Sequence, residues 1–294
     1  MKALVMYNPV AGGGRDALLA RFVVALEARG VKTRVYRTQH AGDATTYLRS
    51  QAIDADIVIA VGGDGTTNEV INGLPDGIPL GVFATGTANV LAQELSLPKR
   101  PEQAAAVIAA GQDVRIWPAL IDGRRFMMMA GLGYDAWVVE GVDLSLKQRL
   151  GKLAYVLSML RQIPRYGAAR YRLLVDGRPH DCFSAILTNG RYYGGSFLLS
   201  RQADISRQAI QVLMFQKSGV GALLRFLLAL LFGRMEQMAG VASVAARRVE
   251  LVSPEGEPVQ VDGDLAGQVP VTIEVDQRPL AIRVPVEAAR RMGL

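Results

Sequence analysis

The 294-residue chain is poor in the residues that build metal and disulfide sites. Its one cysteine, Cys182, cannot close an intrachain disulfide. Its two histidines, His40 and His180, lie far apart in sequence, so no zinc-type spacing is present. A Ser-His-Asp hydrolase is also unsupported, because the sequence has no G-x-S-x-G elbow. These shortages exclude zinc, disulfide and serine-hydrolase chemistry as explanations of function.

The chain also lacks a long hydrophobic run. Its most apolar stretch, Gly219 to Phe232, is interrupted by Arg225 and is shorter than the roughly 20 residues that cross a bilayer. We expect a helix packed on its own domain, with a helix that touches a membrane surface as the alternative. The first residues, "KALVMY", read as a strand and not as the apolar core of a signal peptide. We therefore predict a cytoplasmic protein.

Aromatic residues make up only 6% of the chain, and no zinc-finger spacing, RNP motif or long basic run occurs. Nucleic acid is therefore not an expected partner. The net charge is +6 and the pI is about 9.6, which favours an anionic partner. A nucleotide and an anionic membrane surface both fit this balance.

Strand and helix signals alternate in the first part of the chain, and "DIVIAV" is a continuous apolar run typical of a buried parallel strand. After about Gly111 the pattern changes to hairpins that turn at Asp122-Gly123 and Asp176-Gly177, with a helical segment at 144–163. We predict a doubly wound α/β domain over 1–120 and a β-rich domain over 121–294. The last residues could return to the first domain.

The segment "AVGGDGTTNEVING", Ala60 to Gly73, follows the predicted buried strand and opens a helix. Such strand ends are where open α/β sheets bind ligands, and glycines allow backbone N–H groups to approach phosphates. Thr66 and Glu69 have capping-box spacing, which predicts a helix start at Thr66 or Thr67. Asp64 suggests a divalent cation or a proton-transfer task, with a plain Asp-Gly turn as the alternative.

Two other segments should reach the same sheet edge. "NPVAGGGRD", Asn8 to Asp16, follows the first strand, and "ATGTANV", Ala84 to Val90, follows a later one. Neither segment matches the phosphate-loop pattern or the dinucleotide pattern G-x-G-x-x-G. Ordinary P-loop enzymes and Rossmann dehydrogenases are therefore disfavoured.

Taken together, "NPVAGGG", "GGDGTTNEVINGL" and "ATGTANVLAQELSLP" resemble the lipid-kinase superfamily of soluble bacterial diacylglycerol kinases, sphingosine kinases and ceramide kinases. The resemblance continues through "AGLGYDAWVV", "LTNGRYYGGSF" and "VQVDGDLAGQVP", and so covers nearly the whole chain. It implies a Rossmann-like nucleotide-binding domain, a β-sandwich-like domain and an active site in the cleft between them. It also implies an ATP-dependent lipid kinase that uses Mg²⁺.

The same resemblance assigns roles to residues. Asp264, in the motif Asp262-Gly263-Asp264, would be the catalytic base, where relatives usually have glutamate; Asp64 would act with it and with magnesium. Apart from the resemblance, Asp204 lies near the positions of the missing acidic pair and is a second candidate metal ligand, with a solvated loop residue as the favoured alternative. The ATP-binding residues implied by the resemblance are Asn8, Pro9, Gly12, Gly13, Gly14, Thr38, Gly62, Gly63, Asp64, Gly65, Thr66, Thr67, Asn68, Glu69 and Thr87.

The chain departs from the family where relatives usually carry paired aspartates and a glycine of the magnesium site. Ser206, Arg207 and Gln208 stand there instead, and Val90 replaces a frequent aspartate. A catalytically weak or silent nucleotide- and lipid-binding regulator is therefore an alternative, and an NAD kinase is a less favoured one. For the kinase we expect a diacylglycerol-like or long-chain lipid substrate and peripheral contact with the inner membrane surface. A homo-oligomer is compatible with the sequence.

Buried methionines are usually core residues, but Met127, Met128 and Met129 could also line an acyl pocket together with Trp137 and Phe197.

Overall fold

The computed structural model describes residues 1–10, 16–142 and 152–293. The chain forms two compact units: Met1–Ile116 together with Arg278–Leu294, and Trp117–Gln277. The second half of the segment at 144–163 forms α8 (Lys152–Gln162), and its first residues lie outside the described ones. The predicted fold class, an α/β nucleotide-type domain followed by a β-sandwich-like domain, is confirmed.

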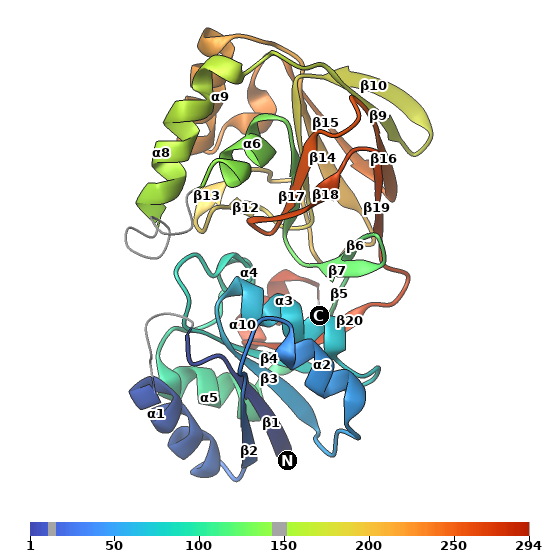
Figure 1. The fold of residues 1–294 in the computed structure, drawn as a ribbon. Coiled ribbons are helices and arrows are strands. Elements are labelled where there is room, and N and C mark those ends of the chain that lie inside the picture. The colour runs from blue at the N-terminus through green and yellow to red at the C-terminus, as the bar shows by residue number, and fades with distance from the viewer. Residues whose placement is uncertain (11–15, 143–151, 294) are drawn as a thin grey trace. The chain divides into compact units, whose positions relative to one another are not determined.

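The first unit is built on a six-stranded sheet in the order β2-β1-β3-β4-β20-β5, parallel except for β5 (Figure 1). β20, which pairs with β4 and β5, comes from the end of the chain. The strands are β1 (Lys2–Tyr7), β2 (Lys32–Arg37), β3 (Ile57–Gly62), β4 (Leu80–Ala84), β5 (Gln112–Ile116) and β20 (Leu280–Val284). The helices are α1 (Asp16–Glu27), α2 (Asp43–Ser50), α3 (Asp64–Gly73), α4 (Val90–Glu94), α5 (Pro101–Ala110) and α10 (Val286–Arg291).

The sequence of β3, IVIAVG, explains its central place, because all six residues are buried and both faces of the strand must be covered. Phe22 of α1 and Ile108 of α5 pack with alternate residues of β1 and β3 in one core cluster. The α2 and α3 helices pack against each other, and α3 also packs on β3 and β4. Helices on both faces of a parallel sheet leave its carboxyl edge as the place for a site.

The second unit is a sandwich of two six-stranded antiparallel sheets, in the orders β10-β9-β16-β19-β6-β7 and β15-β14-β11-β8-β17-β18. Its core lies between these sheets. The strands are β6 (Ala119–Ile121), β7 (Arg124–Phe126), β8 (Met129–Leu132), β9 (Tyr171–Val175), β10 (Arg178–Cys182), β11 (Ser184–Thr188), β12 (Tyr192–Tyr193), β13 (Phe197–Leu198), β14 (Ile210–Phe215), β15 (Val241–Ala246), β16 (Arg248–Ser253), β17 (Pro258–Val261), β18 (Asp264–Gln268) and β19 (Val271–Val275).

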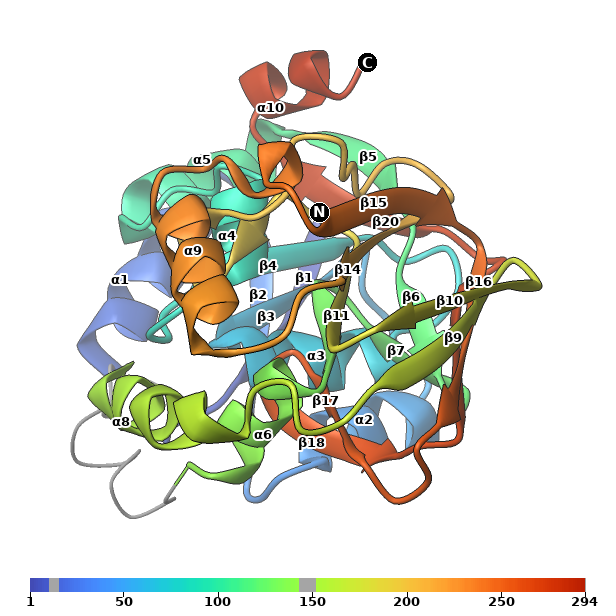
Figure 2. The same ribbon diagram turned by 90° about the horizontal axis from the view of Figure 1, so that it is seen from above.

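Helices α6 (Tyr134–Glu140), α8 and α9 (Val220–Leu231) lie on one side of this sandwich, as Figure 2 shows. Short 3₁₀ turns follow α8 at Ile163–Arg165 and α9 at Met235–Gln237. The sequence predicted two helices in this domain and missed α6, which has only seven residues. Within the described residues, no helix is both long and apolar enough to cross a membrane.

Candidate functional site

The glycine-containing segments after β3 and β4 lie against each other at the carboxyl edge of the parallel sheet. The backbone N–H of Thr85 donates to the carbonyl of Gly62 over 2.7 Å. A Cβ added at Gly86 would lie 2.5 Å from the Cα of Gly63. Position 86 therefore has no room for a side chain, and the close contact between the two backbones requires glycine there.

Asp64, the first residue of α3, has its carboxylate near the start of α4. The backbone N–H groups of Asn89, Val90 and Leu91 face it closely enough to lower its pKa, and N–H groups at the start of a helix have no partner inside that helix. Burial raises the pKa of Asp64 above its usual value, and the hydrogen bonds offset part of that rise. Asp64 therefore lies beside the second glycine segment, a position that the sequence did not reveal.

The helix after the central loop begins earlier than predicted. The capping-box spacing placed its start at Thr66 or Thr67, but α3 begins at Asp64, with Gly63 as the N-cap and no side-chain cap. The Thr67 hydroxyl donates back to the Gly63 carbonyl over 3.2 Å, as threonine often does inside helices. The Thr66 side chain is buried over Gly62, where a Cβ would lie 2.6 Å from the Thr66 Cβ. The capping-box prediction is therefore wrong.

Asn8 connects the first loop to this edge. Its backbone N–H donates to the carbonyl of Val61 over 3.2 Å, and its side-chain N–H donates to the Thr66 hydroxyl over 3.3 Å. Its side-chain oxygen accepts the backbone N–H of Val10 over 3.0 Å, which shapes the turn through Pro9. Of the residues predicted to bind nucleotide in this loop, Gly12, Gly13 and Gly14 lie outside the described residues.

Three other predicted residues make contacts within the first unit. Thr38 is buried after β2, and its hydroxyl donates to the last carbonyl of β1 over 3.3 Å. The backbone carbonyl of Asn68 accepts the Asn72 side chain over 2.8 Å, and that of Glu69 accepts the Thr45 hydroxyl over 2.7 Å. The described contacts of these residues hold the helices and strands that surround the loops.

Four buried side-chain polar atoms have no hydrogen-bond partner among the described residues. Two of them, Oγ1 of Thr85 and Oδ1 of Asn89, lie in the segment after β4; the others are Oη of Tyr7, at the end of β1, and Oδ1 of Asn189, in the second unit. Buried polar atoms normally have hydrogen-bond partners, so those of Thr85 and Asn89 could bond to a polar ligand at this edge. Gly65, in the first turn of α3, and Thr87, in the segment after β4, are exposed. Together with the first N–H groups of α3, this edge suits a ligand that carries phosphate.

In the second unit, Asp262-Gly263-Asp264 forms the hairpin turn between β17 and β18. Asp262 and Gly263 have φ values of 50° and 90°, which Asp-Gly hairpin turns require. The Asp262 carboxylate accepts the backbone N–H groups of Met127 and Met128, which connect β7 to β8, and of Met129, the first residue of β8, over 3.0, 3.0 and 2.9 Å. Asp262 is therefore structural, whereas Asp264 begins β18 and is exposed.

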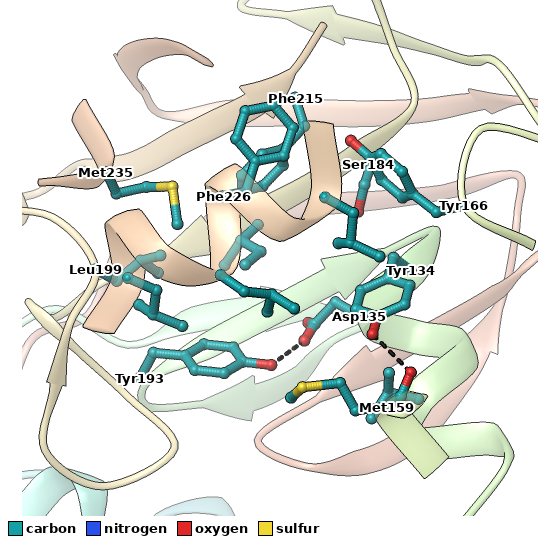
Figure 3. A pocket seen from close by; sticks show the side chains of 15 residues that line it. Tyr134, Asp135, Met159, Tyr166, Ser184, Tyr193, Leu199, Phe215, Phe226 and Met235 are labelled. Carbon is teal, nitrogen blue, oxygen red and sulfur yellow. Dashed lines mark hydrogen bonds between the residues drawn. The ribbon is translucent and has the colours of Figure 1, made fainter. Parts of the chain in front are cut away.

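An apolar pocket lies among α6, α8, α9 and strands β11 and β14 of the second unit (Figure 3). Its empty volume is about 550 Å³, part of which is open to solvent. It is lined by Tyr134, Asp135, Val138, Met159, Tyr166, Ser184, Ile186, Tyr193, Leu199, Phe215, Leu223, Phe226, Leu227, Leu230 and Met235. Asp135 is the one charged side chain among these described lining residues. A mainly apolar pocket with a few convergent polar groups is typical of a small-molecule site.

Asp135 is buried at this pocket and is held by two side chains. The Tyr193 hydroxyl donates to one carboxylate oxygen, and Gln260 Nε2 donates to the other over 2.6 Å. Burial raises the pKa of Asp135, and these two hydrogen bonds partly counteract it. Gln260 Oε1 in turn accepts the backbone N–H of Gly263 over 3.0 Å. Hydrogen bonds therefore connect the carboxylate of the pocket to the turn that carries Asp264.

Gly131 of β8 leaves the space that Asp135 occupies. A Cβ added at Gly131 would lie 2.6 Å from Asp135 Cγ and 2.7 Å from Gln260 Nε2, and nearer still to an Asp135 oxygen. Sequence reasoning gave no role to Asp135, Tyr193 or Gln260. A signal was present in "AGLGYDAWVV", where an aspartate follows a glycine by four residues, but sequence alone cannot show that this carboxylate is buried.

The pocket excludes the residues that the sequence suggested for an acyl site. Met127, Met128 and Met129 are buried elsewhere. Trp137 belongs to the sandwich core and donates to Glu257 over 2.8 Å. Phe197 is exposed on β13 and does not line the pocket. These residues therefore do not line this pocket, and the burial of the methionines agrees with the core interpretation.

Asp204 is engaged by the residues that replace the family's acidic pair. Its carboxylate accepts the backbone N–H and the hydroxyl of Ser206 over 3.0 and 2.6 Å, and it pairs with Arg207 over 3.3 Å. The described part of the chain contains no group of three His, Cys, Asp or Glu residues that could hold a metal ion. These side chains do not form a protein cage for Mg²⁺.

A nucleotide-type α/β unit and a β-sandwich with an apolar pocket are the two parts expected of a lipid kinase. The model of the "Diacylglycerol kinase catalytic domain" family matches residues 2–118. The model of the "YegS C-terminal NAD kinase beta sandwich-like domain" matches residues 128–286. The chain belongs to the diacylglycerol kinase family, and the lipid-kinase class predicted from the sequence is confirmed.

Individual relatives agree with this membership. The chain is 29% identical to a diacylglycerol kinase of Bacillus subtilis over 99% of both chains. It is 30% identical to one of Staphylococcus carnosus, over 92% of this chain and 90% of the relative. A diacylglycerol kinase structure from Bacillus anthracis superposes with a TM-score of 0.79 at 26% identity and covers 96% of each chain. An NAD kinase of Archaeoglobus fulgidus, solved with ATP, has a TM-score of 0.56 over all of this chain and 97% of its own, and its 15% identity shows a shared fold alone.

Proposed function

We propose that this protein transfers the terminal phosphoryl group of ATP to the hydroxyl of a diacylglycerol-like lipid. The pocket carries the proposal, because its apolar lining suits an acyl chain and its single carboxylate suits a polar head. Asp135 has a partner on each oxygen, yet each oxygen has two lone pairs. It can therefore accept a further hydrogen bond from a glycerol hydroxyl.

ATP would bind at the carboxyl edge of the first unit's sheet. The N–H groups at the start of α3 and the unpartnered atoms of Thr85 and Asn89 support this assignment. Asp64 would act as a positioning residue, since its carboxylate lies beside the first N–H groups of α4. Asn8 and Pro9 would border the same nucleotide.

Asp264 is the proposed general base. The lipid hydroxyl attacks the terminal phosphorus of ATP, its proton passes to the Asp264 carboxylate, and the bond to ADP breaks. The exposed position of Asp264 leaves it accessible to a substrate. Gln260 stabilises the turn that carries Asp264 by accepting the backbone N–H of Gly263, and it also donates to Asp135. The described residues thus support both lipid binding and proton removal in the same unit.

Magnesium would arrive with ATP, because Mg²⁺ is usually held by phosphates and waters with only one or two carboxylates. It would offset charge on the transferred phosphoryl group. We assign it no cage of protein ligands, in keeping with the contacts of Asp204 and with the replacement of the family's acidic pair. The lipid substrate and the positive net charge support work at the inner membrane surface.

The test is transfer of radiolabelled phosphate from ATP to diacylglycerol in detergent micelles, with Mg²⁺ present. We expect a labelled lipid from the wild-type protein and a loss of about 10²–10⁴-fold in kcat for Asp264→Asn. Asp122→Asn is the matched control, because Asp122 begins another Asp-Gly hairpin turn of the same unit. A long-chain alcohol and NAD serve as competing acceptors.

Each outcome separates one alternative. ATP binding without transfer to any acceptor would refute the kinase and favour a silent nucleotide-binding regulator. Phosphorylation of NAD in preference to the lipid would refute the substrate assignment. Full activity of Asp264→Asn would remove Asp264 from the role of base while leaving the kinase in place.

A further inference from the structure

Helix α9 is apolar on nearly all sides but is not fully buried. Its sequence, VGALLRFLLALL, contains one charged residue, Arg225. A helix with this composition is normally enclosed by protein or lipid. Its inner face meets that expectation, since Leu223 and Phe226 are buried and line the pocket beside Leu227 and Leu230. Its outer face does not.

The outer face carries a continuous stripe of exposed hydrophobic side chains. We define the outer stripe as five residues that are 46%, 47%, 52%, 60% and 74% exposed, namely Val220, Leu224, Leu228, Leu231 and Phe232. The first four belong to α9, and their spacing of four, four and three residues places them on one side of the helix. Scattered exposed leucines need no explanation, but a stripe of this kind marks an interaction surface.

Positive charges flank the outer stripe. Lys217 precedes α9, Arg225 lies within it and Arg234 follows it, and all three are exposed. Among the described residues none of these three forms an ion pair within 4 Å. The segment 216–235 contains no acidic residue, and the next one, Glu236, bonds to Ser200. This end of the second unit is therefore apolar and cationic at once.

We propose that α9 docks on an anionic bilayer, with the outer stripe inserted at the boundary between head groups and acyl chains. The inference rests on the proposed lipid substrate and names the surface that reaches it. A twelve-residue helix is too short to span a bilayer but suits an interfacial position. Its cations would meet anionic head groups, and its opposite face would hold the lipid pocket next to the layer that supplies the substrate.

A second copy of the chain is a weaker fit to the same surface. Stable protein interfaces use roughly 20–30 residues a side, whereas the outer stripe has five. A symmetric pairing of α9 with itself would also bring the Arg225 side chains of two copies near each other without an acidic partner in the helix. Charge complementarity therefore favours the bilayer.

The experiment is cosedimentation with phosphatidylcholine vesicles that contain phosphatidylglycerol, compared with phosphatidylcholine alone. The test variant Leu224→Gln/Leu228→Gln changes two exposed side chains outside the pocket, and we expect its partition coefficient to fall about tenfold or more. Arg225→Gln should weaken binding to the anionic vesicles and leave binding to the neutral ones unchanged. Val24→Gln, at a 65% exposed position of α1, is the control and should bind like the wild type.

Activity on a short-chain diacylglycerol dispersed in detergent separates this inference from the proposed function. We expect the double variant to keep wild-type activity there and to lose activity on vesicles. Equal vesicle binding by the double variant and the wild type would overturn the docking surface, even if the kinase is active. The docking surface would also be overturned if sedimentation velocity showed that the wild type is a dimer and the double variant a monomer, while both bound vesicles equally. Vesicle binding as expected with no phosphorylation of any lipid would refute the function and leave the surface standing.

Discussion

The substitution Gly131→Ala tests whether the buried carboxylate of the pocket depends on its glycine. The new methyl group would lie 2.6 Å from Asp135 Cγ and 2.7 Å from Gln260 Nε2, well inside normal contact distances. Overpacking of this kind costs about 1–3 kcal/mol. Moving Asp135 also breaks its hydrogen bonds to Tyr193 and Gln260, and bonds to a charged group contribute about 1.5–3 kcal/mol each. Since such terms are not additive, we expect a loss of about 3–5 kcal/mol of unfolding free energy.

Urea unfolding followed by tryptophan fluorescence measures this loss of unfolding free energy in the second unit, which contains Gly131. Both tryptophans of the chain, Trp117 and Trp137, belong to the second unit. Gly221→Ala is the control, because a Cβ there meets nothing within 4 Å and its backbone has no positive φ. The control should unfold within about 1 kcal/mol of the wild type. If Gly131→Ala unfolds at the wild-type urea concentration, the packing argument for Asp135 is wrong.

Two further predictions concern the carboxylates of Asp64 and Asp135. If the Asp64 carboxylate caps α4, Asp64→Ala should lower hydrogen-exchange protection of the amides of Asn89, Val90 and Leu91 about tenfold, which corresponds to the roughly 1–2 kcal/mol of a lost helix cap; unchanged protection would show that it does not cap this helix. For Asp135, burial raises the folded-state pKa above the unfolded value, so the native state binds more protons between the two values. Unfolding free energy should therefore fall as pH rises through that window. Asp135→Asn lacks this titration, so its stability relative to the wild type should improve from about pH 4 to neutral pH, and urea melts that show the opposite trend would refute the assignment.

The sequence predicted the first unit's loops well because their signal is local. A buried apolar strand followed by glycines, and then by a helical pattern, can be recognised without knowing any distant contact. The start of α3 was misplaced for a physical reason. The spacing of Thr66 and Glu69 matches a capping box, but α3 begins two residues earlier, at Asp64, so Thr66 lies in the first turn, buried over Gly62, and not at the N-cap.

The pocket could not be predicted because its parts come together only through long-range pairing. Asp135 and Gln260 are 125 positions apart, and Tyr193 comes from a third segment. The methionines chosen from sequence are apolar and adjacent, yet their backbone N–H groups bind Asp262 and their side chains lie in the core. Hydrophobicity alone does not distinguish a residue that lines a cavity from one that fills a core.

The two sites share one local construction. In the first unit, Gly62 ends β3 and leaves room for Thr66 in the first turn of α3. In the second, Gly131 near the end of β8 leaves room for Asp135 in the first turn of α6. In both cases a strand glycine precedes a polar helix residue by four positions, and a Cβ on the glycine would collide with that side chain. A strand that turns directly into a helix brings the first helical turn back over its own end, so a polar side chain can be buried there only if the strand residue beneath it is small. These glycines therefore place polar, hydrogen-bonding side chains over the ends of buried strands in both candidate sites.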